Sequence, residues 1–271
     1  MASPTSTALA DRAPADRAPA DRAPAADDGP VLRFEQVAKV FPDGTEAVAA
    51  CDLAVHPGEL VSIVGPSGCG KSTLLRIAAG LDVATSGTVE VDRSNIGYVF
   101  QDANLLPWRT VRRNVELFLQ LRDVPKAERS ERVERALATV GLTEFADHHP
   151  AALSGGMRMR ASLARSLTLD PPVFLFDEPF GSVDEITRER LNEELLALFG
   201  KLRFGGLFVT HSVYEAVFLA THVAVMSARP GCIVDVIDVP FGYPRSADLR
   251  HEPEFARITG QVSKALRSVH R

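Results

Sequence analysis

Cysteine is scarce in this chain of 271 residues, and long uninterrupted apolar runs are missing from it. The three cysteines, Cys51, Cys69 and Cys232, are too few and too scattered for a disulfide framework or a zinc site. We therefore expect free thiols in a reducing compartment. No apolar run approaches the roughly 18 residues that cross a bilayer, and residues 1–12 lack the apolar stretch of a secretion signal. We expect neither a membrane-spanning nor an exported protein.

An excess of positive charge is also absent. The chain has 30 Lys and Arg against 35 Asp and Glu, which gives a formal net charge of −5. This balance argues against nucleic acid as a partner. Hydrophobic residues make up 45% of the chain, as in an ordinary globular protein. The length predicts one large domain, or a domain with a sizeable insertion.

Residues 1–30 differ in composition from the rest of the chain. The pentamer Ala-Asp-Arg-Ala-Pro occurs in tandem at 10–14, 15–19 and 20–24, and the segment has no aromatic or β-branched apolar residue. Such a segment cannot bury enough apolar surface to offset the entropy of ordering. We expect a disordered tail before a domain at 31–271, with a docking peptide as the alternative.

From residue 31, apolar β-rich runs alternate with helical stretches. Strands are predicted at 32–37, 47–55, 60–64, 87–91, 96–100, 173–176, 206–210, 222–226 and 232–239. Helices are predicted at 71–79, 111–122, 126–140, 155–169, 185–201, 213–220 and 253–268. The apolar runs at 60–64 and 173–176 are typical of central parallel strands. The block at about 102–169 is almost wholly helical, so we expect an α/β core with a helical insertion.

A glycine-rich stretch follows the predicted strand at 60–64 and matches the phosphate-binding pattern G-x-x-x-x-G-K-[ST]. It consists of Gly65, Pro66, Ser67, Gly68, Cys69, Gly70, Lys71, Ser72 and Thr73. Its glycines let backbone N–H groups point at an anion, and the following helix adds its positive end. Lys71 is suited to the β and γ phosphates and Ser72 to Mg²⁺. An ordinary glycine-rich turn is the alternative. For Cys69, inside this loop, we expect the role of a small filler, with a redox sensor as the alternative.

An apolar strand leads directly into the adjacent carboxylates Asp177 and Glu178. Such a strand delivers Asp177 to the carboxyl edge of the sheet, where ligands bind in open α/β folds. We expect Asp177 to serve Mg²⁺, directly or through water, and Glu178 to accept a proton from an attacking water. The alternative is a pair of helix-capping acids.

A second anion-binding helix terminus is predicted at Ser154, Gly155 and Gly156. Ser154 is a plausible N-cap, and the two glycines leave backbone N–H groups uncovered. Taken alone, these residues also fit a simple capped helix start.

The order of these motifs along the chain is as informative as the motifs themselves. The P-loop is followed by Gln101, the Ser154 segment, Asp177 with Glu178, Asp184 and His211. In this combination the chain resembles the ATP-binding cassette ATPases, the nucleotide-binding subunits of ABC transporters, from about residue 31 to 267. The resemblance implies an α/β fold: a P-loop NTPase core with a mostly parallel sheet, an antiparallel β subdomain and an inserted α-helical subdomain.

The resemblance also implies a role for each motif residue. Two copies pair head to tail around two ATP molecules, so that Ser154, Gly155 and Gly156 reach the γ-phosphate held by the P-loop of the partner. Glu178 is then the general base, and His211 contacts the γ-phosphate. Ser72, Gln101 and Asp177 serve Mg²⁺, Gln101 also bridges to the helical subdomain, and Asp184 communicates across the dimer.

Two positions depart from the family pattern. Phe41 is the best candidate for stacking on adenine, where the family often has Tyr, and a core role for Phe41 stays open. Met157 replaces the Gln that commonly ends the signature segment, but Ser154 and both glycines remain, so we expect nucleotide binding to survive.

Finer resemblance points to the nitrate, sulfonate and taurine importer subgroup, through residues 104–111, 153–160 and 226–231. It implies permease subunits as partners, indirectly a solute-binding protein, and a peripheral position on the cytoplasmic membrane face. Leu106 and Trp108 would lie where family members receive the membrane subunit, with internal packing as the alternative. A soluble ABC ATPase acting as an assembly module is the competing function, and a small-molecule P-loop kinase leaves Ser154 and His211 unexplained.

Overall fold

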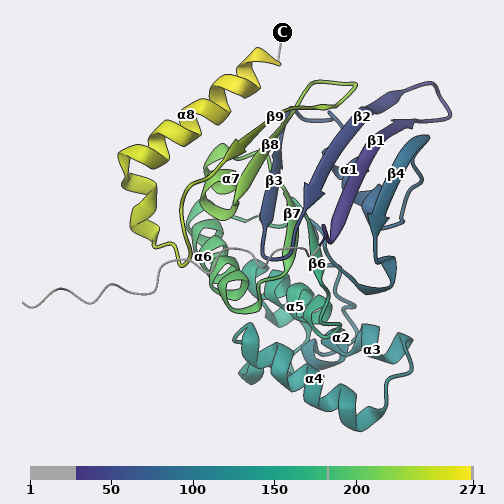
Figure 1. Cartoon of the computed structure of the whole chain (residues 1–271). Helices are drawn as coiled ribbons and strands as arrows, with labels where there is room; N and C mark the ends of the chain where they lie inside the picture. Colours follow the sequence, from purple (N-terminus) through teal and green to yellow (C-terminus); the bar gives the residue numbers. More distant parts are fainter. Residues whose placement is uncertain (1–28, 182, 270–271) are drawn as a thin grey trace, which may run out of the picture.

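The computed structural model describes residues 29–181 and 183–269. The predicted tail at 1–30 lies outside the described residues except for Gly29 and Pro30. Figure 1 shows two sheets side by side, with one group of helices below the larger sheet and other helices along its side.

The larger sheet carries the strands that end in the chemical motifs. Its order is β5-β6-β7-β3-β8-β9, and neighbouring strands are parallel except for the antiparallel pair β8-β9. The strands are β3 (Leu60–Val64), β5 (Ile96–Val99), β6 (Val173–Asp177), β7 (Gly205–Val209), β8 (His222–Met226) and β9 (Ile233–Asp238). All residues of β3 and β7 are buried, since helices and the second sheet cover both faces. The continuous apolar runs of these strands follow from this burial.

The smaller sheet is antiparallel, with the order β2-β1-β4. Its strands are β1 (Leu32–Val40), β2 (Glu46–Val55) and β4 (Ser86–Val91). Alternate residues of β1, including Leu32 and Phe34, point into the core that this sheet shares with β3 and α1 (Lys71–Ala78).

Apart from α1, the helices form two groups (Figure 1). The lower group contains α2 (Val111–Val115), α3 (Leu117–Leu121), α4 (Lys126–Thr139) and α5 (Gly155–Leu167). The side group contains α6 (Glu185–Leu202), α7 (Val213–Leu219) and α8 (Pro253–Ser268). The two groups meet where α5 packs against α6. Short 3-10 turns occur at Arg93–Asn95, Thr143–Phe145, Pro150–Ala152 and Ala247–His251. No helix among the described residues is long and apolar enough to cross a bilayer.

The predicted single helix at 111–122 is instead two short helices. The chain tightens at Glu116, whose backbone N–H is shared between the carbonyls of Arg112 and Asn114. The Glu116 carboxylate accepts hydrogen bonds from Gln120 and Arg129, at 2.8 Å each. These contacts hold Glu116 at the junction between α2 and α3.

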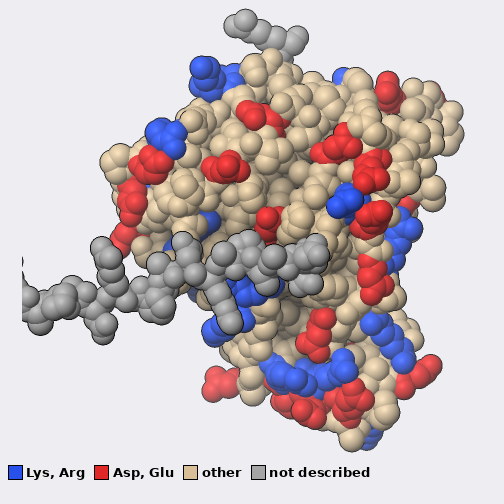
Figure 2. All heavy atoms as spheres, viewed as in Figure 1, with Lys and Arg blue, Asp and Glu red and all other residues tan. Residues whose placement is uncertain are grey.

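Charged side chains crowd the lower helical group, as Figure 2 shows for one face. Acidic and basic groups are interspersed there rather than separated. Arg112 contacts both Glu134 and Asp147, and Arg132 pairs with Glu128 at 2.7 Å. On this face the pairing leaves no broad field of one sign.

A buried arginine joins α5 to the loop that follows β5. Arg165 is only 4% exposed, and its guanidinium donates to the carbonyls of Ala103 and Asn104 at 3.1 and 2.9 Å. Hydrogen bonds of this kind offset the cost of burying the charge. The helix that begins at Gly155 and the loop that begins near Gln101 are therefore attached to each other at this point.

Candidate active site at the carboxyl edge of the parallel sheet

Three adjacent strands end at the same place in the molecule. β3 lies beside β7, and β7 lies beside β6, all parallel, so their carboxyl ends share one edge of the sheet. The P-loop follows β3, Asp177 and Glu178 end β6, and His211 follows β7 by two residues. Strand order alone therefore gathers residues that are more than 100 positions apart in the sequence.

The P-loop forms a tight backbone turn around the Lys71 ammonium. Lys71 is 5% exposed, and its Nζ donates to the carbonyls of Gly65 and Pro66 at 2.9 and 3.0 Å. Gly70, directly before α1, has φ of 111°, and a Cβ here would lie 2.6 Å from the carbonyl oxygen of Ala47. Only glycine accepts this conformation and this close approach. The N-terminus of α1 and the Lys71 charge thus make an anion site.

Ser72 and Asp177 are in direct contact across the site. The Ser72 hydroxyl donates to Asp177 Oδ1 at 2.7 Å, and Tyr98 donates to Oδ2 at 3.2 Å. Burial, together with the nearby Asp177 carboxylate, raises the pKa of Tyr98 and keeps its hydroxyl protonated as a donor. The hydroxyl and carboxylate oxygens are the donor type that Mg²⁺ prefers.

Asp177 and Ser72 do not form a complete metal cage. The described residues hold no group of three or more His, Cys, Asp or Glu side chains suited to a metal. A magnesium ion at Ser72 and Asp177 would therefore draw other ligands from phosphate and water, as is usual in nucleotide sites.

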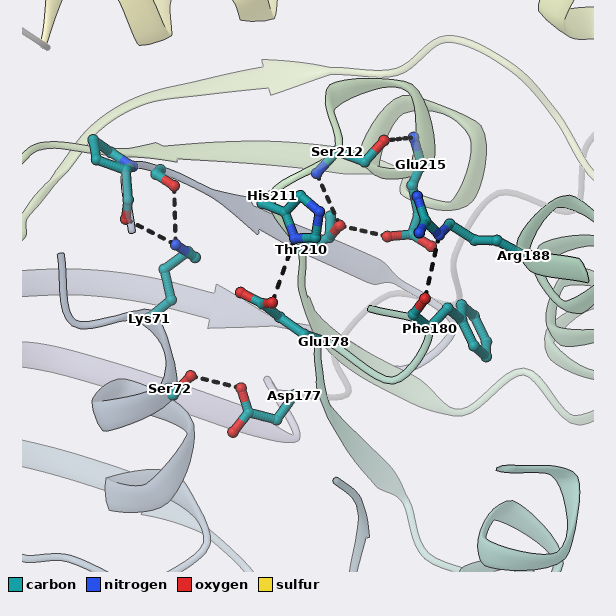
Figure 3. A network of polar contacts seen from close by, with 12 residues as sticks. Lys71, Ser72, Asp177, Glu178, Phe180, Arg188, Thr210, His211, Ser212 and Glu215 are labelled. Carbon is teal, nitrogen blue, oxygen red and sulfur yellow. Dashed lines mark hydrogen bonds and ion pairs between the residues drawn. The ribbon is translucent and has the colours of Figure 1, made fainter. Parts of the chain in front are cut away.

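Glu178 and His211 face each other above this pair, as Figure 3 shows. His211 Nδ1 lies 3.4 Å from Glu178 Oε2. The Glu178 backbone has φ of 46°, and its N–H donates to the carbonyl of Val209 at 3.0 Å. A left-handed conformation is unusual for Glu, and strain of this kind gathers at functional sites. It turns the carboxylate toward His211.

Gln101 lies beside the loop that follows Glu178. A Cβ on Gly181 would lie 3.3 Å from Gln101 Nε2 and 3.7 Å from Glu178 Oε2. Gln101 and the Glu178 carboxylate therefore border the same backbone segment. The Gln101 side chain is exposed.

The Ser154 segment contacts a different part of the molecule. The Ser154 hydroxyl accepts a hydrogen bond from the Met157 N–H at 3.3 Å and caps α5. Ser154 and Gly155 are exposed, while Gly156 is buried against Thr187 and Leu191 of α6. The predicted cap is confirmed, but these contacts do not bring the segment to the P-loop of the same chain.

Asp184 caps the next helix. Its carboxylate accepts from the Thr187 N–H at 3.0 Å, and this bond to the backbone lowers the pKa of Asp184. The capping side chains Ser154 and Asp184 are both exposed.

Phe41 lies at the border between the core and the surface. The ring is half-buried and packs against the core below the smaller sheet. Its centroid lies 5.2 Å from Lys39 Nζ, which is paired with Asp82 at 2.6 Å. Cys69 is 1% exposed, which fits a small filler inside the loop.

Sequence reasoning missed two residues that support the P-loop from outside. Arg229 donates to the Gly68 carbonyl through Nε at 3.1 Å and Nη2 at 2.8 Å. A Cβ on Gly231 would lie 2.0 Å from the carbonyl oxygen of Cys69, so only glycine fits there. The Arg-Pro-Gly turn was visible in the sequence, but nothing local indicates a contact 161 residues away.

Comparisons with known proteins agree with this geometry. The family model described as ABC transporter matches residues 48–181. The nitrate import ATP-binding protein NrtD of Synechocystis sp. is 43% identical over 252 residues, which cover 87% of this chain and 95% of that protein. The taurine import ATP-binding protein TauB of Pseudomonas aeruginosa is 43% identical over 218 residues, covering 76% of this chain and 83% of the relative.

Solved structures give the same result. A dimeric post-hydrolysis state of the ATP-binding cassette MJ0796, bound to ADP and Pi, is 31% identical with a TM-score of 0.66. The match covers 78% of this chain and all of that chain. The ABC transporter component cbiO1 of Clostridium perfringens has a TM-score of 0.73 over 87% of this chain; at 23% identity it supports the fold alone. This chain belongs to the ABC transporter family, as one of its ATP-binding and ATP-hydrolysing subunits.

Proposed function

We propose that this chain powers an ABC importer for nitrate, a sulfonate, taurine or a similar small solute. The relatives named for nitrate, taurine and aliphatic sulfonate import, at 41–43% identity, support this substrate class. The observation that carries the enzymatic part is the meeting of Lys71, Asp177 and Glu178 at one sheet edge. Strand order brings together the groups that bind phosphate, hold a cation and accept a proton.

Each residue of this edge has a distinct part in ATP hydrolysis. Lys71 releases the carbonyls of Gly65 and Pro66 and binds the β and γ phosphates instead. Ser72 and Asp177, with Gln101, would hold Mg²⁺, which neutralises developing charge on the phosphates when bound. Glu178 takes a proton from the attacking water.

His211 contacts the γ-phosphate and keeps the Glu178 carboxylate in place. The 3.4 Å approach of His211 Nδ1 to Glu178 Oε2 supports this shared task. The His211 side chain is 55% exposed although it contacts Glu178, so it is accessible to a ligand.

A second copy of the chain completes the site. Ser154 and Gly155 are exposed at the N-terminus of α5, a helix of 13 residues without acidic residues in its first turn. Uncovered N–H groups at a helix start attract an anion, and the contacts of this segment lie away from its own P-loop. We infer that it binds the γ-phosphate held by the P-loop of the partner, while Asp184 lies near the two-fold axis.

The permease contact lies on the lower helical group. Trp108 is 71% exposed, so internal packing does not explain it. Together with Arg109, Arg112 and Arg113 it lines a hollow between α2 and the start of α4. Arg112 is already paired with Glu134 and Asp147, so the exposed Trp108 ring is the main contact that this hollow offers, and it suits an apolar segment of a membrane subunit. A solute-binding protein would then act through the permease, with this chain on the cytoplasmic membrane face.

Mixing two inactive variants tests the shared site. Lys71→Ala removes the phosphate-binding charge, and Ser154→Arg blocks the contact with the partner. Each pure variant should be inactive, but a mixed dimer contains one intact site. A 1:1 mixture should recover about a quarter of the wild-type sites, because half of the dimers are mixed. A mixture as inactive as its components would contradict the two-chain site.

A separate measurement tests the transport role. The subunit is purified with a candidate permease in lipid nanodiscs, and its ATPase rate is compared with and without the binding protein and its solute. We expect solute-dependent stimulation. A rate indifferent to the permease, together with soluble partners in a pull-down, would favour an assembly ATPase instead.

A further inference from the structure

We propose that Glu215 is a positioning residue that holds the turn carrying His211, and that it acts on ATP hydrolysis through this histidine. Glu215 lies in the first turn of α7 and is 6% exposed. It touches none of the phosphate-binding groups. Burying a carboxyl group costs free energy unless it is hydrogen-bonded or paired, so the partners of Glu215 show what it holds.

A ring of hydrogen bonds runs around His211 without including its side chain. Thr210 Oγ1 donates to Glu215 Oε2, and the Ser212 N–H donates to Thr210 Oγ1 at 3.0 Å. The Ser212 hydroxyl accepts from the Glu215 N–H at 3.3 Å. Both neighbours of His211 are therefore tied to Glu215, one through its carboxyl group and one through its backbone (Figure 3).

The ring fixes the direction of the imidazole. Thr210 is 1% exposed and Ser212 is half-buried, whereas the His211 side chain is 55% exposed and points toward Glu178. With the residues before and after it anchored, the backbone of His211 cannot rotate freely. The histidine therefore keeps its orientation without a buried partner of its own, as preorganised catalysis requires.

Helix α6 supports the carboxyl group from the other side. Asn192, 4% exposed, borders the same hollow as Glu215. The positive charge of Arg188 faces it as well. Arg188 also donates to the carbonyls of Phe180 and Val183 at 3.2 and 3.0 Å. The same stretch of α6 thus holds both the His211 turn and the loop that follows Glu178, which fixes these two active-site groups relative to each other.

This proposal rests on the proposed role of His211, so the experiment separates the two. We measure kcat and KM for MgATP in His211→Ala, Glu215→Ala and the double variant, with Glu215→Gln as the conservative change. Glu215→Ala should lower kcat by about tenfold with little change in KM. In the His211→Ala background the same change should alter the residual kcat less than twofold, because the residue through which it acts is gone.

The conservative variant distinguishes positioning from charge. Gln still offers a side-chain oxygen to the Thr210 hydroxyl, so Glu215→Gln should keep most of the kcat that Glu215→Ala loses. Glu189→Gln, an exposed neighbour on α6, is the matched control and should leave kcat unchanged. In NMR spectra, the His211 imidazole signal, assigned by its loss in His211→Ala, should shift or broaden in Glu215→Ala and return in Glu215→Gln.

The outcomes are distinct. If His211→Ala leaves kcat unchanged, the role proposed for the histidine is wrong. If His211→Ala lowers kcat but Glu215→Ala lowers it equally in both backgrounds, or leaves the His211 signal untouched, the positioning role of Glu215 is wrong. The NMR signal decides the matter even where the double variant has no measurable activity.

Discussion

The P-loop and the Ser154 segment both present a helix N-terminus, yet they are built in opposite ways. The P-loop is enclosed: Lys71 is buried under two carbonyls, Arg229 holds Gly68 from outside, and Gly231 presses against Cys69. Ser154 and Gly155 are exposed, and the first turn of α5 holds them through two bonds, from the Met157 N–H to the Ser154 hydroxyl and from the Arg158 N–H to the Ser154 carbonyl.

This difference fits a nucleotide site to which each of two chains contributes one half. The P-loop must bind a highly charged ligand on its own, so its donors are preorganised by surrounding structure. The Ser154 segment meets the ligand only when a partner arrives, so it needs exposure more than enclosure. A site that forms when two chains close together needs a rigid P-loop on one chain and an accessible Ser154 segment on the other.

Glu178→Gln should have the largest effect, because it blocks hydrolysis without changing the P-loop or the Ser154 segment. Without a proton acceptor, turnover should fall by about 10²–10⁴-fold, while both phosphate-binding sides stay intact. ATP and Mg²⁺ should then trap a dimer, visible by size-exclusion chromatography with light scattering. A variant that stays monomeric under these conditions would argue against the sandwich.

Gly231→Ala should distort the P-loop through a steric clash. Its Cβ would lie 2.0 Å from the Cys69 carbonyl oxygen, so the loop must shift at a cost of about 1–3 kcal/mol. We expect ATP affinity to fall by roughly tenfold, measured by calorimetry. Gly242→Ala has open space around the new Cβ and serves as the control. Equal affinity in both variants would show that the segment after β8 does not shape the loop.

Arg229→Ala should have a milder effect on the same loop. The arginine is exposed, and its two bonds to Gly68 stabilise the turn by about 0.5–1.5 kcal/mol in net terms. ATP affinity should fall by roughly three- to tenfold, with kcat nearly unchanged. Arg190→Ala, which removes a surface ion pair with Glu194, is the control. An equal fall in ATP affinity in this variant would contradict the role of Arg229 at the P-loop.

Glu215→Gln should give the smallest effect, visible in stability. Burial raises the pKa of Glu215, so the folded chain favours the protonated acid. The resulting stabilisation is full below the unfolded pKa, near about 4.3, and is lost as pH rises. Gln never ionises, so the melting temperature of the variant relative to wild type should increase from pH 5 to 8.

An exposed acid provides the control for this pH series. Hydrogen bonds from Arg257 lower the pKa of Glu254, so Glu254 is ionised in both states throughout that range. Glu254→Gln should therefore show a flat difference in melting temperature between pH 5 and 8. A flat curve for Glu215→Gln as well would mean that its carboxyl group is not desolvated.

Local sequence signals sufficed for most of the fold. Each predicted strand is present, because short apolar runs such as 60–64 and 173–176 end at glycine or charged residues. The P-loop and the cap at Ser154 follow from residues within a few positions of each other. The junction at Glu116 was missed, because 111–122 contains no Gly or Pro that would mark a break and the Glu116 carboxylate binds Arg129 and Gln120 instead.

Contacts between distant segments escaped prediction. Gly68 and Arg229 have no local feature that links them, and their pairing becomes visible only when β3 and β8 lie side by side. The ring formed by Thr210 and Glu215 is closer in sequence, but burial of the acid could not be read from a short helix with both polar and apolar residues. Sequence therefore identifies the groups that meet the nucleotide better than those that hold them.

Because Arg165 donates to the carbonyls of Ala103 and Asn104, one end of α5 is fixed to the loop that follows β5. Helix α5 is about 16 Å long from Arg165 to Ser154. A tilt of about 10° at the anchored end would displace its tip by about 3 Å, roughly the length of one hydrogen bond. A small shift of the loop beside Gln101 would therefore be large enough at Ser154 to make or break one hydrogen bond.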